Sequence, residues 1–204
     1  MLTKIAVLVS GNGTNLQALI DAEKNGKLEN CQLALVISNN PNAYALKRAA
    51  EHNIMHFVIS RKAYKTSLEY EEAMQNLLLE YKIDLIVLAG FMSILSPQFI
   101  QMFPNRIINI HPSLIPSFCG NGYYGIKVHQ AVLKYGVQIT GATVHYVNEI
   151  IDGGKIILQK SVMVQPLDTP ESLQKRVLEE AEWVILPKAV TLVAQELKKE
   201  KQDD

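Results

Sequence analysis

The residues best suited to chemistry are an asparagine and a histidine two positions apart at the end of an apolar run. Asn109 and His111 follow Ile107 and Ile108, in a segment whose composition predicts a buried strand. Side chains alternate along a strand, so residues two positions apart point to the same face. The amide can then donate a neutral hydrogen bond while the imidazole handles a proton.

A carboxylate further along the chain is a candidate partner for this histidine. Asp152 precedes Gly153 and Gly154, which predict a tight turn. An amide, a histidine and an acid suit the stabilisation of a charged tetrahedral intermediate and the transfer of a proton from an amine. Asn109, His111 and Asp152 are therefore the predicted catalytic residues.

The segments that must position these residues alternate in type. Short, continuous apolar runs predict buried parallel strands, and the amphipathic stretches between them predict helices. The expected strands cover residues 5–9, 33–37, 85–89 and 107–110, and the expected helices cover residues 15–24, 43–52, 68–81 and about 97–102. This alternation predicts an α/β fold with an open, doubly wound, mostly parallel sheet and helices on both faces.

The second half of the chain has a different pattern. Residues 139–147 and 155–164 flank the Asp-Gly-Gly turn and alternate more in polarity, which predicts a C-terminal antiparallel strand pair. A long helix is expected from about Thr169, and Pro187 is expected to kink or break it. In a doubly wound sheet, ligands bind at the carboxyl ends of the strands, and the polar clusters of this chain follow such ends.

Composition restricts the class of protein. The 204 residues predict a single domain over residues 1–204, with a charged, fraying helix end at about 198–204. Twenty basic and twenty acidic residues argue against binding of nucleic acid through bulk charge. Cys31 and Cys119 form neither a metal-like spacing nor a disulfide framework, so a reduced, cytoplasmic compartment is expected. No apolar segment is long enough for a signal sequence or a membrane span.

A glycine-rich turn between the first expected strand and helix predicts an anion site. In residues 10–15 (SGNGTN), glycines allow close backbone approach, and Thr14 with the N–H groups of the helix start can bind a phosphate. Leu16 stands where a dinucleotide-binding turn carries its third glycine, and no Gly-Lys-Ser/Thr follows, so neither common nucleotide motif is present. An ordinary capped turn is the alternative interpretation.

Two further loops follow expected strands or prolines. Residues 120–125 match the dinucleotide pattern by letter but follow no strand, so we expect a mobile, glycine-hinged loop near the site. Its Tyr123 and Tyr124 either cover a ligand or only pack. Residues 89–95 either line an apolar slot for a flat ring or pack in the core.

The other histidines are expected to be structural. His52 and His56 are predicted at the surface, on either side of the start of a strand. His129 is predicted on a helix at a surface or half-buried contact, and His145 within a strand. Of the five histidines, only His111 has a polar partner at strand-end spacing. A nucleophilic role for Cys119 is disfavoured, because nothing in the sequence indicates activation of that thiol.

Together these motifs resemble the phosphoribosylglycinamide formyltransferases, a branch of the folate-dependent formyltransferase family. The resemblance runs from about residue 4 to about residue 187. It rests on SGNGTN at residues 10–15, ISNNP at 37–41, LAGFM at 88–92, NIHPSLIP at 109–116 and the Asp-Gly-Gly turn. The Asn-His-Asp set is shared across formyl-folate enzymes, and the SGNGTN loop selects the glycinamide ribonucleotide branch.

The resemblance implies a formyltransferase-type fold and formyl transfer from the co-substrate 10-formyltetrahydrofolate to the amine of glycinamide ribonucleotide, in purine biosynthesis. The amine would attack directly, with Asn109 and a cationic His111 stabilising the oxyanion. Asp152 would raise the pKa of His111, and a proton would pass to the leaving folate nitrogen through water held by Asp152. The resemblance implies no metal, no nucleic-acid or membrane partner, and a monomer or homodimer.

The resemblance also implies two binding regions and a cis peptide at Ile115-Pro116. The expected substrate-binding residues, of which Glu182 would touch the ribose, are Asn12, Gly13, Thr14, Asn15 and Glu182. The expected folate-binding residues are Ser67, Met92, Ser93, Ile94, Leu95, Asn109, Val147, Glu149 and Ile150. Ser67 and Ser93 stand where the family commonly has arginine, and residues 117–127 replace a shorter, His-containing segment.

Other functions are compatible with parts of this pattern. A 10-formyltetrahydrofolate hydrolase would use the same three residues to activate water and would not need the phosphate loop. Formylation of an aminoacyl-tRNA usually needs an added nucleic-acid-binding domain, for which this chain has no room. A folate- or nucleotide-binding regulator without catalysis would not need Asn109, His111 and Asp152 together.

Overall fold

The computed structural model describes residues 2–203 and contains one seven-stranded sheet in the order β3-β2-β1-β4-β5-β6-β7. The strands are β1 (Thr3–Val9), β2 (Cys31–Ser38), β3 (Met55–Val58), β4 (Leu85–Leu88), β5 (Ile107–His111), β6 (Ile139–Tyr146) and β7 (Ile156–Met163). The first five strands pair in parallel, and β5-β6 and β6-β7 pair antiparallel. The mostly parallel sheet with a C-terminal antiparallel pair is thereby confirmed.

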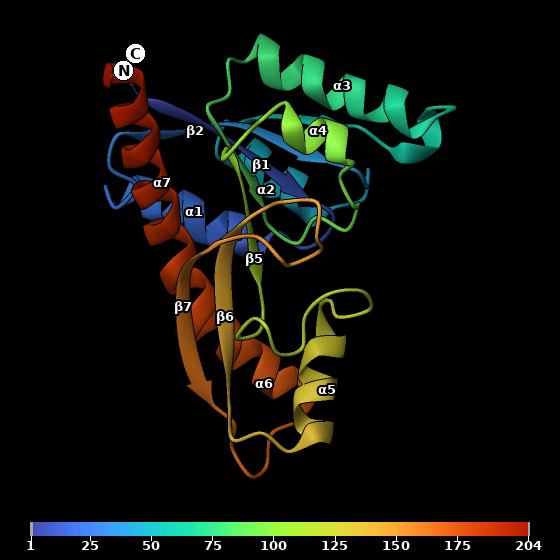
Figure 1. Cartoon of the computed structure of the whole chain (residues 1–204), viewed down its shortest axis with the longest axis vertical. Helices are drawn as coiled ribbons and strands as arrows, with labels where there is room; N and C mark the ends of the chain where they lie inside the picture. Colours follow the sequence, from blue (N-terminus) through green and yellow to red (C-terminus); the bar gives the residue numbers. More distant parts are fainter. Residues whose placement is uncertain (1, 204) are drawn as a thin grey trace.

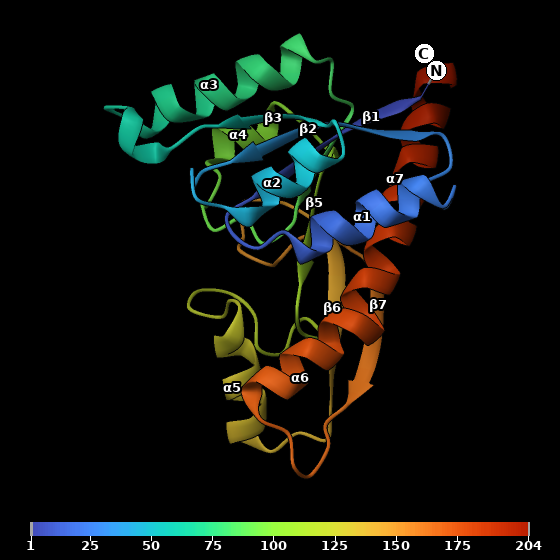
Figure 2. The same ribbon diagram turned by 180° about the vertical axis from the view of Figure 1, so that it is seen from behind.

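Helices cover both faces of the sheet, as the sequence predicted. They are α1 (Thr14–Lys24), α2 (Tyr44–Glu51), α3 (Ser67–Glu80), α4 (Pro97–Gln101), α5 (Ile126–Tyr135), α6 (Pro170–Val177) and α7 (Trp183–Asp203), with a 3₁₀ turn at Arg61–Ala63 and a π-helical turn at Leu178–Glu182. Helices α3 and α4 lie on one side of the sheet, and α1, α2 and α7 lie on the other (Figure 1; Figure 2).

Two apolar cores flank the sheet because the central strands are buried on both faces. Val7 of β1 packs in the core with α1 and α7, and Leu8 packs in the core with α3 and α4. A continuous run of apolar residues is what such a strand requires. The core on the side of α1 and α7 continues along the β6-β7 hairpin to α5 and α6, in the lower part of Figure 1. Val128 and Leu173 are fully buried there.

Two elements lacked a clear sequence signal. β3 is a four-residue edge strand in which only Phe57 is partly buried, so it carries no apolar run. For helix α5, the sequence predicted only that His129 lies on a helix, without bounds. Helix α5 begins directly after Gly125 and ends at Tyr135, and the following Gly136 adopts the left-handed conformation typical of a glycine after a helix.

The long C-terminal helix is interrupted before its proline rather than at it. Pro187 does not break the helix, because α7 continues through this residue, and a kink there stays a prediction. The irregularity is the π-helical turn at Leu178–Glu182, which immediately precedes the first turn of α7. A widened turn next to a proline can absorb the missing backbone hydrogen bond and the bulk of the ring.

The charged C-terminal segment continues α7 as far as Asp203, and Asp204 lies outside the described residues. Its fraying stays a prediction, as does the single-domain boundary at residues 1–204. None of the helices within residues 2–203 combines the length and apolarity that crossing a membrane would need.

The β6-β7 pairing leaves no room for a side chain at Gly141. A Cβ added there would lie 2.0 Å from the Lys160 carbonyl oxygen. We expect Gly141→Ala to lower the free energy of unfolding by about 3 kcal/mol, because strands must shift to relieve the overlap. Chemical denaturation measures this loss. Gly11→Ala, where an added Cβ meets nothing within 4 Å, is the matched control, and equal stability of the two variants would contradict the prediction.

Candidate active site

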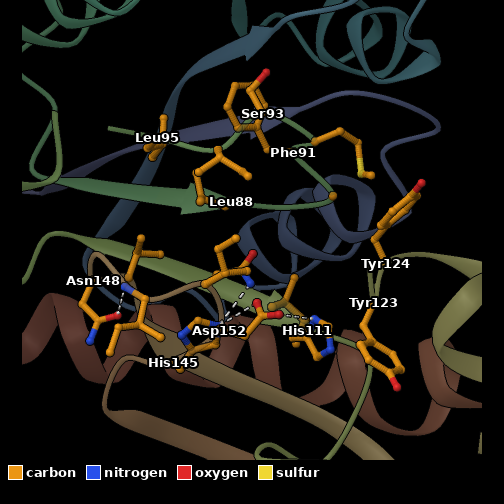
Figure 3. Close-up of a pocket in the computed structure, with 18 of the residues that line it drawn as sticks. Leu88, Phe91, Ser93, Leu95, His111, Tyr123, Tyr124, His145, Asn148 and Asp152 are labelled. Carbon is orange, nitrogen blue, oxygen red and sulfur yellow. Dashed lines mark hydrogen bonds and ion pairs between the residues drawn. The ribbon is translucent and has the colours of Figure 1, made fainter. Parts of the chain in front are cut away.

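The three predicted catalytic residues meet at the carboxyl end of β5. Asn109 and His111 are the third and fifth residues of β5, and Asp152 lies on the turn between β6 and β7. One carboxylate oxygen, Oδ2, lies 3.5 Å from His111 Nδ1, and the other, Oδ1, lies 3.7 Å from His145 Nε2. Figure 3 shows Asp152 between the two imidazoles at the base of the pocket.

His145 belongs to this cluster, although the sequence alone suggested that only His111 had a polar partner. In the antiparallel pairing of β5 and β6, Asn109 stands opposite His145, and Asn109 Nδ2 lies 3.1 Å from His145 Nε2. His145 is buried, with 2% of its surface exposed. The sequence alone did not show that β5 pairs with β6, and it is this pairing that places His145 beside Asn109.

Backbone carbonyls fix the protons on both imidazoles. The Phe118 carbonyl oxygen lies 2.9 Å from His111 Nε2, and the Tyr146 carbonyl oxygen lies 2.8 Å from His145 Nδ1. A carbonyl only accepts, so each of these nitrogens carries the hydrogen. In a neutral His145 the remaining nitrogen, Nε2, then accepts from the Asn109 amide, which orients that amide.

The electrostatics of His111 differ from the expectation. Burial lowers the pKa of His111 below its usual value of 6.5, and it outweighs the opposing effects of Asp152 and of the Phe118 carbonyl. The expectation of a cationic His111 at neutral pH was therefore wrong. Although burial by itself raises the pKa of Asp152, hydrogen bonding, which includes the Gly120 N–H, and the two neighbouring histidines lower it overall, so Asp152 is ionised.

The loop after β5 is tied to the same cluster. The Gly120 N–H donates to Asp152 Oδ2 over 2.8 Å, and Phe118 accepts from His111 as described. Ile115-Pro116 is a cis peptide, as the resemblance implied. Tyr123 and Tyr124 line the pocket rather than the core (Figure 3). Mobility of this loop stays a prediction.

A cavity of about 230 Å³ opens above the three residues, between the ends of β4 and β5 and the turn after β6. Eight of the nine predicted folate-binding residues line it: Met92, Ser93, Ile94, Leu95, Asn109, Val147, Glu149 and Ile150. Its mostly apolar wall includes Leu88 and Phe91 and suits a flat ring. Residues 89–95 were expected either to line a slot or to pack in the core. Met92 and Ile94 are exposed and line the slot, whereas Leu95 lines it and also packs in the core.

The two serines in the expected folate region lie in different places. Ser93 lines the cavity and its hydroxyl accepts from Asn39 Nδ2 over 2.8 Å. Ser67 does not line the cavity. It begins α3, and its hydroxyl accepts from Arg61 Nη2 over 3.2 Å.

The glycine-rich loop lies beside this cavity. The Ser10 hydroxyl accepts from the Met92 N–H over 2.8 Å, which links the loop to the cavity wall. Gly13 has φ +71° and caps α1, and a Cβ there would lie 2.6 Å from Ala45 Cβ, so only glycine fits. The N–H groups of residues 12–15 have no acceptor among the described residues. The sequence-predicted anion site therefore has its donors available.

Glu182 is hydrogen-bonded to the glycine-rich loop through Asn15. Asn15 Nδ2 donates to Glu182 Oε2 over 2.7 Å, and the glutamate sits on the π-helical turn with 5% of its surface exposed. Burial raises the pKa of Glu182 to about 7, against the lowering effect of Asn15. Its carboxyl is not among the groups lining the catalytic cavity.

His129 departs from expectation because it is fully buried rather than at a surface or half-buried contact. Neither ring nitrogen finds a hydrogen-bond partner among the described residues. Burial, and then the nearby His111, lower its pKa to about 4, so the ring is neutral. Helix α5 places this polar residue inward, which the sequence pattern did not reveal.

Cys119 lies near the cluster without an activating environment. Burial and the Asp152 charge raise the pKa of its thiol, so the thiolate is disfavoured at neutral pH. Its Sγ donates to the Pro116 carbonyl oxygen. Within residues 2–203, no group of three or more His, Cys, Asp or Glu side chains is arranged to hold a metal ion.

Comparison with known proteins agrees with this geometry. The model of the formyl transferase family matches residues 3–190, so the chain belongs to that family. A phosphoribosylglycinamide formyltransferase from Haemophilus influenzae is 45% identical over 184 residues, which cover 90% of this chain and 84% of that protein. The crystal structure of glycinamide ribonucleotide transformylase 1 from Symbiobacterium toebii matches with a TM-score of 0.89 and 39% identity, over 96% of this chain and 89% of that one.

A related enzyme of different activity also shares the fold. The crystal structure of a formyltetrahydrofolate deformylase from Pseudomonas syringae pv. tomato matches with a TM-score of 0.84 and 28% identity. That match covers 96% of this chain and 62% of the deformylase chain. Fold alone therefore does not separate transfer from hydrolysis.

The buried carboxyl of Glu182 makes stability depend on pH. Its pKa is about 7 in the folded protein against an ordinary 4.5, so the folded state binds the proton more tightly. Stability from this group is present below pH 4.5 and is lost as the pH rises towards 7 and above. We expect Glu182→Gln to gain on the order of 3 kcal/mol relative to the original protein between pH 4 and pH 8.

Chemical denaturation at the two pH values measures this difference. Glu180→Gln removes an exposed carboxylate from the same π-helical turn and controls for net charge. A Glu182→Gln profile parallel to that of the original protein would show that the buried carboxyl does not titrate in this range.

Proposed function

We propose that this chain transfers the formyl group of 10-formyltetrahydrofolate to the amine of N1-(5-phospho-ribosyl)glycinamide, a step of purine biosynthesis. The observation that carries the proposal is the adjacency of two features. The glycine-rich loop has free N–H donors, and its Ser10 is hydrogen-bonded to Met92. Met92 lines the same cavity as Asn109, His111 and Asp152. A phosphate on the loop and a folate in the cavity would bring amine and formyl group together.

The folate ring is assigned to the apolar cavity and the phosphate to residues 12–15. The cavity walls between Leu88 and Ile94 suit a flat heterocycle, and Asn109 at its base faces the position for a formyl group. For the phosphate, the free N–H groups at the start of α1 provide both donors and the positive end of the helix dipole. Glu182 acts through Asn15 in this proposal, whereas a direct ribose contact would require it to leave its buried position.

Attack of the amine on the formyl carbon forms an N–C bond and places negative charge on the formyl oxygen. The Asn109 amide has two hydrogens, of which one points to His145, so the second is free for this oxyanion. A well-placed donor of this kind contributes about 3 kcal/mol to lowering the barrier. His145 holds the amide in place.

We assign proton transfer to His111 in its neutral form. Its Nε2 hydrogen is held by Phe118, so Nδ1 carries the lone pair and faces Asp152. This nitrogen can accept the proton that the attacking amine loses, and Asp152 stabilises the resulting imidazolium. Breaking of the bond from the formyl carbon to the folate nitrogen then returns the proton to that nitrogen. The reaction balances without a metal or a covalent intermediate on the enzyme.

A 10-formyltetrahydrofolate hydrolase is the second candidate, because a deformylase shares the fold and the same three residues could activate water. The free N–H donors of residues 12–15 favour the transferase, since hydrolysis has no use for a phosphate site. The proposal further implies a cytoplasmic enzyme with small-molecule partners, as a monomer or homodimer.

Formyl transfer can be followed spectrophotometrically with 10-formyl-dideazafolate as donor. We expect turnover only when the ribonucleotide is present. Loss of the formyl group without ribonucleotide would favour the hydrolase and contradict the proposal.

The role of Asp152 is tested in the same assay. Asp152→Asn is isosteric but cannot stabilise a protonated His111, so kcat should fall about 10²- to 10⁴-fold with little change in melting temperature. Asp21→Asn, which removes an exposed carboxylate of α1, should leave kcat within twofold of the original. Near-normal turnover of Asp152→Asn would refute the assigned role.

A further inference from the structure

Arg48 of α2 reaches across to the glycine-rich loop. Its Nε donates to the Asn12 carbonyl oxygen over 2.9 Å, and its Nη1 donates to Gln17 Oε1, also over 2.9 Å. The guanidinium lies 4.9 Å from the centroid of the Tyr44 ring. Three contacts in different directions hold the side chain, so it is placed to act on the loop backbone rather than to extend into solvent.

The Arg48 contact determines which way a peptide unit of the loop faces. The Asn12 carbonyl and the Gly13 N–H belong to one planar trans peptide, in which the two groups point in opposite directions. Because the carbonyl is held on the side of α2, the Gly13 N–H is turned away from α2. Without the Arg48 contact, this peptide could rotate readily, since Gly13 is free of the usual backbone restrictions.

A second contact from α2 acts on the preceding peptide in the same sense. The Ala45 N–H donates to the Gly11 carbonyl oxygen over 3.2 Å, so the Asn12 N–H is also turned away from α2. Both N–H groups lack an acceptor among the described residues, as do those of Thr14 and Asn15. Two successive loop amides therefore face away from α2 with free N–H groups and are followed directly by the free donors of the α1 start. Successive free backbone N–H groups of this kind can enclose an anion.

We propose that Arg48 is a positioning residue for the substrate phosphate, acting by fixing the Asn12-Gly13 peptide so that its N–H faces the anion. This inference rests on the proposed function in that the phosphate is that of the ribonucleotide. Arg48 acts through the loop backbone, and its charge is a secondary contribution.

Two substitutions separate orientation from charge. Arg48→Gln places an amide N–H donor where Arg48 Nε now lies but removes the charge, whereas Arg48→Met removes both. We expect Arg48→Met to raise the dissociation constant of the ribonucleotide about tenfold, the effect of losing one hydrogen bond to a charged group. Arg48→Gln should raise it less than threefold, while kcat and the KM for the formyl donor change little in either variant.

Lys47→Met provides the matched control on the same helix. Lys47 also lies over the Tyr44 ring, at 5.4 Å, and pairs with Glu51 across the exposed face of α2. Its replacement removes one positive charge near the loop without touching the Asn12 carbonyl, and should leave ribonucleotide binding within twofold. A glycinamide ribonucleoside lacking the phosphate should react equally well with the original protein and with Arg48→Met.

Calorimetric titration with the ribonucleotide, in the absence of folate, measures binding independently of turnover. The inference is overturned if Arg48→Met and Lys47→Met weaken binding equally, or if Arg48→Gln is as impaired as Arg48→Met, which would assign the effect to charge. Failure of the proposed function would appear differently, as an original protein that binds the ribonucleotide but does not formylate it. Thermal melts of all three variants exclude a general loss of folding.

Discussion

The structure of the site depends on one partly buried carboxylate shared by two histidines. Removing a carboxylate from water is unfavourable unless partners satisfy it, and the Gly120 N–H donates to one oxygen of Asp152. The imidazole nitrogens near the two oxygens carry lone pairs in the neutral rings, so the carboxylate stabilises either ring once that ring takes up a proton. Its turn requires φ +55° at Asp152 and no side chain at Gly154, where a Cβ would lie 1.7 Å from a carbonyl oxygen. The turn after β6 and the loop after β5 therefore converge on the same point.

This convergence explains how a mostly apolar cavity carries out acid–base chemistry. Burial holds His111 neutral, and the Phe118 carbonyl places its one hydrogen on Nε2, so Nδ1 can accept a proton next to a negative charge. His145 directs the Asn109 amide towards the cavity. The parallel strand β5 carries Asn109 and His111, and the antiparallel strand β6 adds His145 opposite Asn109.

The sequence predicted the parts of the fold that have strong local signals. Four strands were visible as continuous apolar runs, and Asn109, His111 and Asp152 were recognisable because strand periodicity and a glycine turn are local properties. The edge strand β3 was indicated only by a strand start between His52 and His56, without bounds, because most of its side chains are exposed. The roles of His145 and Glu182 depend on strand pairing and on helix packing over long separations, and the lowered pKa of His111 depends on burial, which no spacing reveals.

The central claim is that a neutral His111 is poised beside an ionised Asp152, and nitrogen NMR of the histidine side chains tests it most directly. A pH titration of the original protein and of Asp152→Asn, with the signal assigned through a His111→Asn variant, reports both the tautomer and the pKa. We predict a neutral ring with its hydrogen on Nε2 at pH 7, a pKa below 6.5, and a further decrease in Asp152→Asn, because the carboxylate is what opposes burial. A pKa of His111 above 6.5, or one that Asp152→Asn leaves unchanged, would contradict the account.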